Sequence, residues 1–199
     1  MRTPLLAALL AATAALGDAR ADAGGPALAG VATVIDGDTI EIHGRRIRLH
    51  GIDAPEAGQT CRRQSDGQVW PCGRRAAQAL QALLGRRTVE CIPGKTDRYG
   101  RLNARCSVGG VDIEAWMVRQ GWALAYRRYS QDYVDEEAQA RGARRNIWSG
   151  TMQNPERYRR DQATARRSRA VTDCERTPRQ SSASAPGRTP AAENGCARN

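Results

Sequence analysis

The chain has 199 residues and a formal net charge of +10, from 31 basic and 21 acidic side chains. This length fits one domain of ordinary size with tails and excludes an array of several large domains. The positive surplus, nearly all of it arginine, favours a polyanionic partner such as nucleic acid, anionic lipid or an acidic polymer.

The N-terminal segment 1–23 has the features of an export signal. Arg2 gives a positive start, an apolar run extends from Leu5 to Leu16, and small residues around Ala21 offer cleavage sites. The run is shorter than the roughly 20 residues that a membrane-spanning helix needs. We therefore expect export to the periplasm or the medium without stable membrane insertion, the alternative for 1–23 being an ordinary buried helix.

All six cysteines follow this segment, and an even number in an exported chain favours disulfides. Sequence alone leaves the pairing open, but proximity along the chain suggests Cys61–Cys72, Cys91–Cys106 and Cys174–Cys196. A zinc site is the alternative, although the chain has neither a C-x-x-C motif nor a histidine-containing cluster to support it.

The apolar pattern predicts strands first and helices interleaved with them. β-branched residues predict strands between Gly30 and Asp53, with a turn at His43-Gly44, before a long loop over 54–73. The further predicted elements are a helix over 74–84, strands over 88–92 and 102–108 around a loop over 93–100, a helix over 111–120, a strand over 122–126 and a helix over 131–143. This order indicates an α+β domain, a small β-barrel with helices packed on it.

The C-terminal segment 151–199 has few apolar residues and is rich in Arg, Ser, Pro and Ala. One helix could form over 155–169, and the segment as a whole is expected to be a mostly disordered basic tail. A solvated tail is the ordinary interpretation of such a charge run. The alternative is an electrostatic tether to nucleic acid or to the cell envelope.

The acidic residues between 36 and 56 form the most informative cluster. Asp36 and Asp38 are two apart in Ile35-Asp36-Gly37-Asp38-Thr39, so on a strand they share one face. Asp53 ends a neighbouring strand, and Asp53-Ala54-Pro55-Glu56 holds a further carboxylate beside it. Several carboxylates in one place suit a hard divalent cation such as Ca²⁺, although each taken alone is also an ordinary turn residue. Arg48 is an odd number of residues from Asp53, so strand alternation puts the two on opposite faces unless the strand bends or ends.

A second cluster, Asp97-Arg98-Tyr99-Gly100-Arg101, lies in the predicted loop between two strands. A guanidinium can bind a phosphate with two hydrogen bonds and stabilise negative charge on it. The alternative is a charged turn with solvated arginines.

Taken together, the two clusters resemble the thermonuclease, or staphylococcal-nuclease-like, family. The resemblance continues through Glu114-Ala115, Val118-Arg119-Gln120-Gly121, Glu137-Ala138-Gln139-Ala140 and Asn146-Ile147-Trp148-Ser149, and it implies a domain over 30–150. The family fold implied is mainly β with α, an OB-fold five-stranded barrel with three helices. The implied activity is Ca²⁺-dependent cleavage of the 5′ P–O bond of DNA or RNA, which leaves 3′-phosphates.

The resemblance also implies a role for each site residue. Asp38, Asp53 and the backbone carbonyl of Ala54 would hold Ca²⁺, with Asp36 behind them holding metal-bound water. Glu56 would be the general base, and Arg48 and Arg101 would clamp the phosphate. The expected substrate-binding residues are Arg98, Tyr99 and Tyr126.

Two other functions remain open alternatives. A non-catalytic OB-fold would bind nucleic acid without cleaving it, although here every metal, base and arginine position is filled. A histidine-dependent nuclease or phospholipase would need His43 or His50, which are the only histidines and have no metal-ligand spacing. We expect a monomer that acts on DNA, RNA or both.

Overall fold

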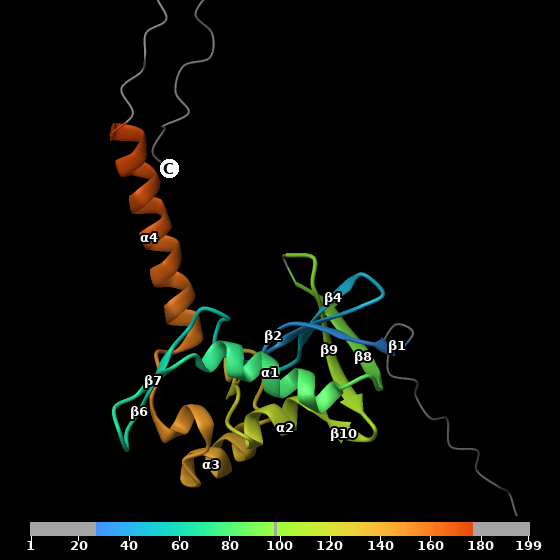
Figure 1. Ribbon diagram of the computed structural model, residues 1–199. Helices are drawn as coiled ribbons and strands as arrows, with labels where there is room; N and C mark the ends of the chain where they lie inside the picture. Colours follow the sequence, from blue (N-terminus) through green and yellow to red (C-terminus); the bar gives the residue numbers. More distant parts are fainter. Residues whose placement is uncertain (1–26, 98, 177–199) are drawn as a thin grey trace, which may run out of the picture.

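The structure is a computed structural model that describes residues 27–97 and 99–176 (Figure 1). The predicted export signal over 1–23, Arg98 and the segment 177–199 lie outside the described residues. The suggested pair Cys174–Cys196 lies outside them too, because Cys196 belongs to that last segment. Within the described residues, no helix is both long and apolar enough to cross a membrane.

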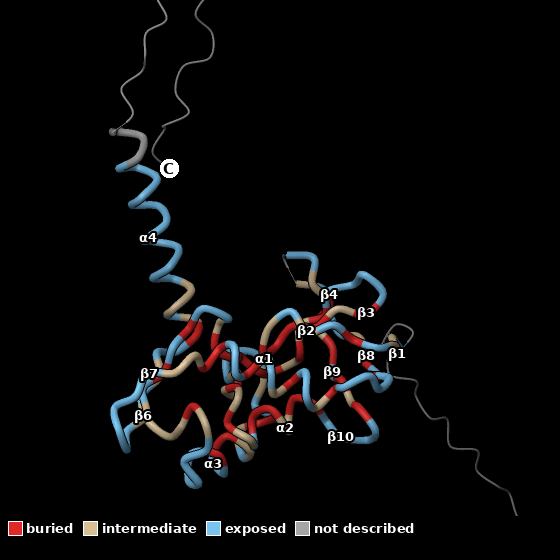
Figure 2. Tube along the Cα trace, viewed as in Figure 1, coloured by how far each residue is buried: buried red, intermediate tan, exposed pale blue. Residues whose placement is uncertain are grey.

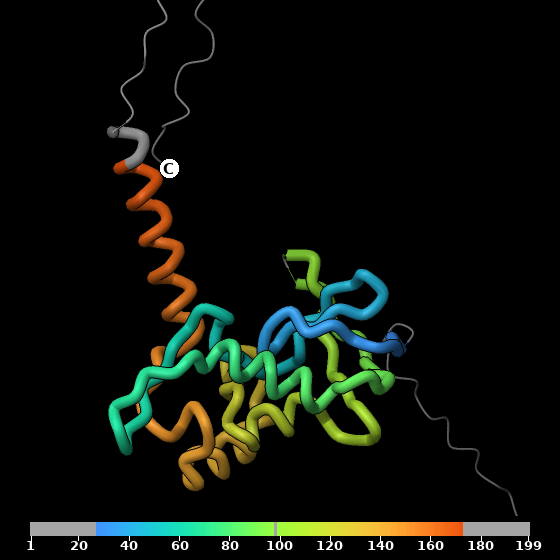
Figure 3. The backbone as a smooth tube through the Cα atoms, viewed as in Figure 1, coloured from blue at the N-terminus to red at the C-terminus, as the bar shows by residue number. Residues whose placement is uncertain are grey.

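The main sheet is built from the N-terminal strands and one long hairpin. Its neighbours follow the order β1 (Leu28–Val31), β8 (Thr88–Thr96), β9 (Leu102–Val108), β4 (Arg45–Leu49), β3 (Thr39–Ile42) and β2 (Thr33–Asp36), with β10 (Val111–Asp112) added to β9. All pairs are antiparallel except β4 with β9. Only Ala32 separates β1 from β2, so the two ends of the sheet belong to one stretch of chain and the sheet curls round (Figures 1 and 3). This α+β architecture with an OB-like barrel confirms the predicted fold class.

The remaining elements surround this sheet. They are β5 (Ile52–Asp53) paired with β11 (Leu124–Ala125), the small sheet β12 (Gly150–Thr151), β6 (Cys61–Arg63) and β7 (Val69–Trp70), and the helices α1 (Cys72–Leu84), α2 (Ile113–Arg119), α3 (Val134–Gly142), η1 (Asn146–Ser149) and α4 (Pro155–Arg176). The predicted loop over 54–73 therefore contains two short strands, because it pairs with the distant residues Gly150 and Thr151. The predicted loop over 93–100 is also shorter, since β8 continues to Thr96.

The core lies between the curled sheet and the helices. Buried and less buried residues alternate along β9, as expected for a strand with one face on the core. Ala76, Leu80 and Leu84 form the buried stripe of α1, which crosses the barrel in Figure 1. The apolar stripe predicted in this helix is thus the surface that closes the barrel.

Two disulfides join neighbouring segments of the fold. Cys61–Cys72 links β6 to the start of α1, and Cys91–Cys106 links the paired strands β8 and β9. Both pairings confirm the prediction made from proximity.

The segment after residue 151 differs from its prediction. A mostly disordered tail was expected over 151–199, with one possible helix over 155–169, but α4 continues to Arg176. Asn154 caps the helix, because its side chain accepts hydrogen bonds from the amides of Glu156 (3.0 Å) and Arg157 (3.3 Å). Pro155 suits the first helical position, and no Gly or Pro interrupts the helix after it. The described part of the tail is therefore a helix that projects from the domain (Figure 1).

Candidate active site

The turn between β2 and β3 directs Asp38 into the protein. The amide of Asp38 donates to Oδ1 of Asp36 (3.0 Å), and the Asp38 carbonyl accepts from the amide of Leu49 (2.9 Å). Its buried side chain accepts a hydrogen bond from the amide of Ala54 at Oδ2 (2.8 Å). A direct hydrogen bond therefore links the acidic motif around Asp38 to the one that contains Ala54.

Gly37 explains why the two motifs can lie so close. A Cβ at this position would lie 2.7 Å from the Cβ of Ala54 and 3.0 Å from the Cβ of Ala76. Any larger residue would push the turn away from α1 and from the segment that follows Asp53. The Asp-Gly-Asp spacing is thus required by packing as well as by the turn.

Arg48 lies between the two buried carboxylates. Its Nη1 donates to Asp38, and its Nη2 donates to Oδ1 of Asp53 (2.9 Å) and more weakly to the carbonyl of Ile52 (3.4 Å). β4 ends at Leu49, and a turn with Gly51 at a φ of +69° leads into β5. Strand alternation had put Arg48 and Asp53 on opposite faces, and this turn brings them together.

The charges of this cluster depend on one another. Burial raises the pKa of Asp38, Arg48 lowers it only in part, and the nearby Asp36 and Asp53 raise it further. Burial would lower the pKa of Arg48, but the attraction of these aspartates outweighs it and raises that pKa. The buried carboxylates therefore need a positive charge beside them.

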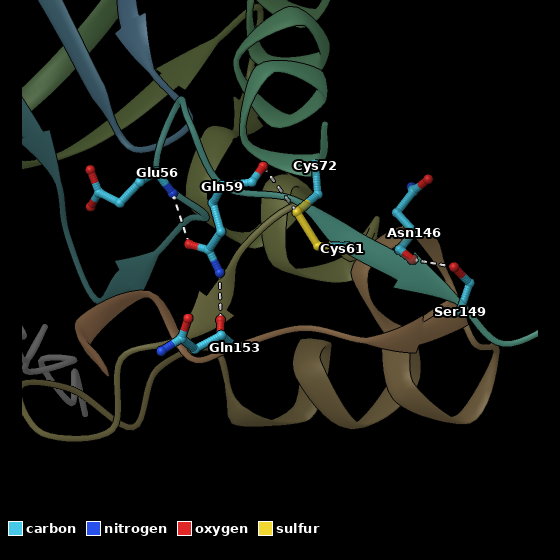
Figure 4. Close-up of a disulfide and its surroundings, with 7 residues drawn as sticks. All are labelled: Glu56, Gln59, Cys61, Cys72, Asn146, Ser149 and Gln153. Carbon is cyan, nitrogen blue, oxygen red and sulfur yellow. Dashed lines mark hydrogen bonds between the residues drawn. A yellow bond between two sulfur atoms is a disulfide. The ribbon is translucent and has the colours of Figure 1, made fainter. Parts of the chain in front are cut away.

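Glu56 is positioned by the loop that follows it. Its amide donates to Oε1 of Gln59 (3.2 Å), and Nε2 of Gln59 donates to the carbonyl of Gln153 (2.5 Å), as Figure 4 shows beside the Cys61–Cys72 disulfide. Gly73, in the first turn of α1, approaches so closely that a Cβ there would lie 1.7 Å from the Glu56 carbonyl oxygen. The backbone of Glu56 is thus held by packing, while its side chain stays partly exposed.

Arg159 of α4 also reaches this cluster, although no sequence pattern had indicated it. Nη1 lies 3.0 Å from Oδ1 of Asp53 and 2.7 Å from Oε1 of Glu56, and Nη2 lies 3.2 Å from Oδ2 of Asp53. Burial would lower the pKa of Arg159, but these two carboxylates outweigh it and raise that pKa. No local signal distinguishes Arg159 from the other arginines of the tail.

Arg101 belongs to a separate loop. Asp97 accepts hydrogen bonds from the amides of Tyr99 (2.9 Å) and Arg101 (3.0 Å), and its Oδ2 accepts from Nε of Arg101 (2.8 Å). The slight burial of Asp97 raises its pKa, but these bonds outweigh it and lower the pKa. Parallel pairing of Arg48 with Asn103 places the loop beside β4. Among the ion pairs of the described residues, Arg101 joins Asp97 and none of the carboxylates around Arg48.

The two predicted substrate tyrosines lie in different surroundings. Tyr99 is exposed in the Arg101 loop, with its ring centroid 5.5 Å from Cζ of Arg101. Tyr126 donates its amide to the carbonyl of Gly51 (2.8 Å), so it adjoins the turn before Asp53. Burial raises the pKa of Tyr126, and the nearby charges of Glu156 and Asp53 raise it further. Tyr126 is therefore the one that lies next to the acidic cluster.

The two histidines have structural contacts elsewhere. Nε2 of His50 lies 3.3 Å from Oδ2 of Asp132, and Nε2 of His43 lies 3.2 Å from the carbonyl oxygen of Ala29. These contacts give each ring a partner outside the acidic cluster.

The donor chemistry of the cluster fits a hard divalent cation. In the part of the chain that the structure describes, no three His, Cys, Asp or Glu side chains are already grouped as a metal site. Asp38 and Asp53 are each only 2% exposed, and the carbonyl of Ala54 follows directly in the chain. Carboxylate and carbonyl oxygens are the ligands that Ca²⁺ prefers, and buried carboxylates gain most from a bound cation.

Comparison with known proteins identifies a family for about half of the chain. The staphylococcal nuclease homologue family matches residues 46–150, a segment that begins within β4 and ends just after η1. The matched segment contains Arg48, Asp53, Glu56 and Arg101, whereas Asp36 and Asp38 precede it.

Curated relatives show the same likeness. The chain is 42% identical over 97 residues to the succinoglycan biosynthesis protein ExoI of Rhizobium meliloti, covering 48% of this chain and 50% of the relative. It is 34% identical over 148 residues to the micrococcal nuclease of Shigella flexneri (65% of this chain, 79% of the relative). It is 35% identical over 126 residues to an uncharacterized endonuclease of Escherichia coli O157:H7 (60% and 75%). The chain thus spans half the length of the first relative and about three quarters of the other two. It belongs to the staphylococcal nuclease homologue family.

Proposed function

We propose that this protein is an exported, Ca²⁺-dependent nuclease that hydrolyses phosphodiester bonds of DNA, RNA or both. The observation that carries the proposal is the meeting of Arg48 with the buried carboxylates of Asp38 and Asp53. Glu56 lies next to this group, because Asp53 and Glu56 accept hydrogen bonds from the same nitrogen of Arg159. Family membership and the names of two relatives, a micrococcal nuclease and an endonuclease, support the same reaction class.

The acidic residues would hold the metal. Asp38, Asp53 and the Ala54 carbonyl would be the direct ligands. Asp36, whose Oδ1 accepts a hydrogen bond from the amide of Asp38, would not bind the metal directly but would hold metal-bound water. When bound there, Ca²⁺ would supply positive charge to a phosphate oxygen and so favour attack on phosphorus.

The remaining residues would move the proton and stabilise the developing charge. Glu56 would accept the proton of the attacking water as that water bonds to phosphorus and the bond to the 5′ oxygen breaks. The departing 5′ oxygen would take up a proton from solvent and leave as a hydroxyl. Arg48 and Arg101 would donate to the phosphate oxygens from two sides as negative charge develops on them. Each of these groups would help, because neutral water is a weak nucleophile and the phosphodiester anion repels the hydroxide-like oxygen that forms as the base removes a proton.

The substrate would lie along the surface beside Asp53. Tyr126 and Glu156 line a shallow pocket of about 350 Å³ together with Arg127 and Arg128. An aromatic ring beside guanidinium groups can stack with a base while the arginines bind the backbone. Tyr99 and Arg98 would contact the nucleotide from the Arg101 loop.

The decisive experiment is hydrolysis of single-stranded DNA and of RNA by the folded, oxidised protein, with Ca²⁺ and then with chelator. We expect cleavage that requires Ca²⁺ and leaves 3′-phosphates. Glu56→Gln should lose turnover while nucleic-acid affinity is retained. Wild-type activity in Glu56→Gln, or cleavage at an unchanged rate in the presence of chelator, would refute the proposal.

The alternative of a non-catalytic binder makes the opposite prediction. Such a protein would bind nucleic acid equally well with and without Glu56 and would cleave nothing in either case. Export is the remaining part of the proposal, and it predicts a mature N-terminus near residue 23 when the exported protein is sequenced. The protein is expected to elute as a monomer.

A further inference from the structure

Arg159 forms hydrogen bonds with the two carboxylates, Asp53 and Glu56, that the proposed reaction would use. It binds both carboxylate oxygens of Asp53 and one oxygen of Glu56, at 2.7 to 3.2 Å. Asp53 is the proposed metal ligand and Glu56 the proposed base. Arg48 also donates to Oδ1 of Asp53, but among the described ion pairs it is Arg159 that joins Asp53 to Glu56. An oxygen that accepts hydrogen bonds from a guanidinium is less available to a cation or to the proton of a water molecule.

The base of α4 holds Arg159 in this position. Arg128 lies 3.2 Å from Glu156, and Nε2 of Gln153 donates to Asp161 (2.6 Å). The Gln153 carbonyl in turn accepts from Gln59, in the loop that positions Glu56 (Figure 4). The first turns of α4 and the Glu56 loop are therefore linked by several polar contacts.

The rest of α4 has no comparable support. Every residue from 161 to 172 is exposed, and Figure 2 shows the helix leaving the domain after its first turns. A helix attached only at its base, here through buried Pro155 and several polar contacts, can detach at low cost compared with a helix packed in the core along its length. The contacts of Arg159 are thus among the few that hold α4 in place.

We propose that Arg159 is an autoinhibitory guard, which neutralises Asp53 and Glu56, competes with Ca²⁺ for them and is displaced with the base of α4 when Ca²⁺ binds. The inference rests on the proposed function, because it takes Asp53 as a metal ligand and Glu56 as the base. It adds a regulatory role for a segment outside the matched family region, which ends at residue 150.

Ca²⁺ binds only to molecules in which Arg159 is displaced. The apparent affinity for Ca²⁺ is therefore the intrinsic affinity multiplied by the fraction of such molecules. Charge-assisted hydrogen bonds of this kind correspond to roughly a tenfold effect on that affinity. We therefore expect Arg159→Ala to bind Ca²⁺ about tenfold more tightly than the wild type, and Arg159→Lys to lie between the two.

The test is calorimetric titration of the mature, oxidised chain with Ca²⁺ alone, in the absence of nucleic acid. Arg160→Ala is the matched control, because Arg160 is exposed on the same turn and its ion pair is with Glu156. This control should bind Ca²⁺ as the wild type does. Wild-type or weaker affinity in Arg159→Ala would overturn the inference.

Hydrogen exchange gives a second measurement that does not depend on any variant. Adding Ca²⁺ to the wild type should accelerate exchange of the α4 amides between 158 and 164, while exchange in α1 stays unchanged. Unchanged protection of the α4 amides on saturation with Ca²⁺ would also overturn the inference, even if Arg159→Ala failed to fold.

The outcomes separate this inference from the proposed function. Ca²⁺-dependent cleavage by the wild type, with no gain in Ca²⁺ affinity in Arg159→Ala, refutes the guard alone. Ca²⁺ binding by Arg159→Ala but not by the wild type supports the guard. Absence of binding in both refutes the guard together with the calcium-dependent function.

Discussion

The two arginines proposed to clamp phosphate are held in different ways. Arg48 is largely enclosed, with its side chain 12% exposed, between Asp38 and Asp53, which come from a turn and from a separate strand. Arg101 lies in an exposed loop, and its ion pair is with Asp97, four residues away. The first arginine is fixed by the packing of the barrel, the second by a local turn.

This difference separates two effects of a mutation, loss of fold stability and loss of interaction with substrate, which a single activity assay would combine. Removal of a buried charge leaves its partners unpaired and destabilises the fold, whereas removal of a loop arginine mainly removes its interaction with substrate. Four predictions test this difference. They ask whether the geometry around Arg48 is maintained by the packing of the whole fold, and whether that of the Arg101 loop is maintained by contacts within the loop alone.

The largest expected effect is that of Arg48→Ala. It should lower kcat by about 10²–10³ and, in chelator, lower the free energy of unfolding by about 3–5 kcal/mol. Arg101→Ala should lose a similar factor in kcat but less than about 1 kcal/mol of stability. Urea denaturation and turnover of both variants check this prediction, and equal destabilisation of the two would remove the distinction.

The next effect concerns the two disulfides. Replacing either pair by alanines should cost about 2–4 kcal/mol of stability. Loss of Cys61–Cys72 should also lower kcat, because this bond lies at the start of α1, where Gly73 supports the backbone of Glu56. Loss of Cys91–Cys106, in the wall of the barrel, should leave kcat unchanged at temperatures where the variant is folded. A fall of kcat in both variants would contradict this assignment.

Glu114 provides a pH-dependent test of the turn after Arg48. Its buried carboxyl accepts hydrogen bonds from the amides of His50 (3.3 Å) and Cys106 (3.0 Å), and burial raises its pKa to about 8. In the unfolded chain this carboxyl has the ordinary glutamate pKa of 4.5. Between these two values the folded state therefore holds a proton that the unfolded state releases.

Stability should accordingly fall as the pH rises from about 4.5 to about 8, by at most about 1.4 kcal/mol per pH unit. Glu114→Gln should remove this part of the slope, because glutamine does not titrate. Urea midpoints of the wild type and the variant between pH 5 and pH 9 measure the difference. Parallel pH profiles for the two proteins would argue against a protonated Glu114.

The smallest expected effect is that of Asp97→Asn. Asparagine can still accept the amides of Tyr99 and Arg101, but it loses the ion pair with the Arg101 guanidinium. We expect KM for DNA to change severalfold with less than about 1 kcal/mol lost in stability. Steady-state kinetics and thermal unfolding measure the two quantities, and a large loss of stability would show that the loop is tied to the core.

Local patterns in the sequence determined much of this protein. β-branched alternation predicted the strands around Ile40 and Ile42, an apolar stripe predicted α1, and short separations along the chain predicted both disulfides that the structure describes. These features depend on neighbours in the chain, so they can be recognised without the fold. The site motifs were recognised together because their order and spacing resemble a known family.

Only the tertiary structure decided how those motifs meet. The turn at Gly51 placed Arg48 beside Asp53, which strand alternation had placed on the opposite face. The strands of the 54–73 loop formed because Gly150 and Thr151 pair with β6. Arg159 reached Glu56 across 103 residues of sequence, through a helix expected to be part of a largely disordered tail. Such contacts follow from the packing of distant segments and the neutralisation of buried charge, which no local pattern specifies.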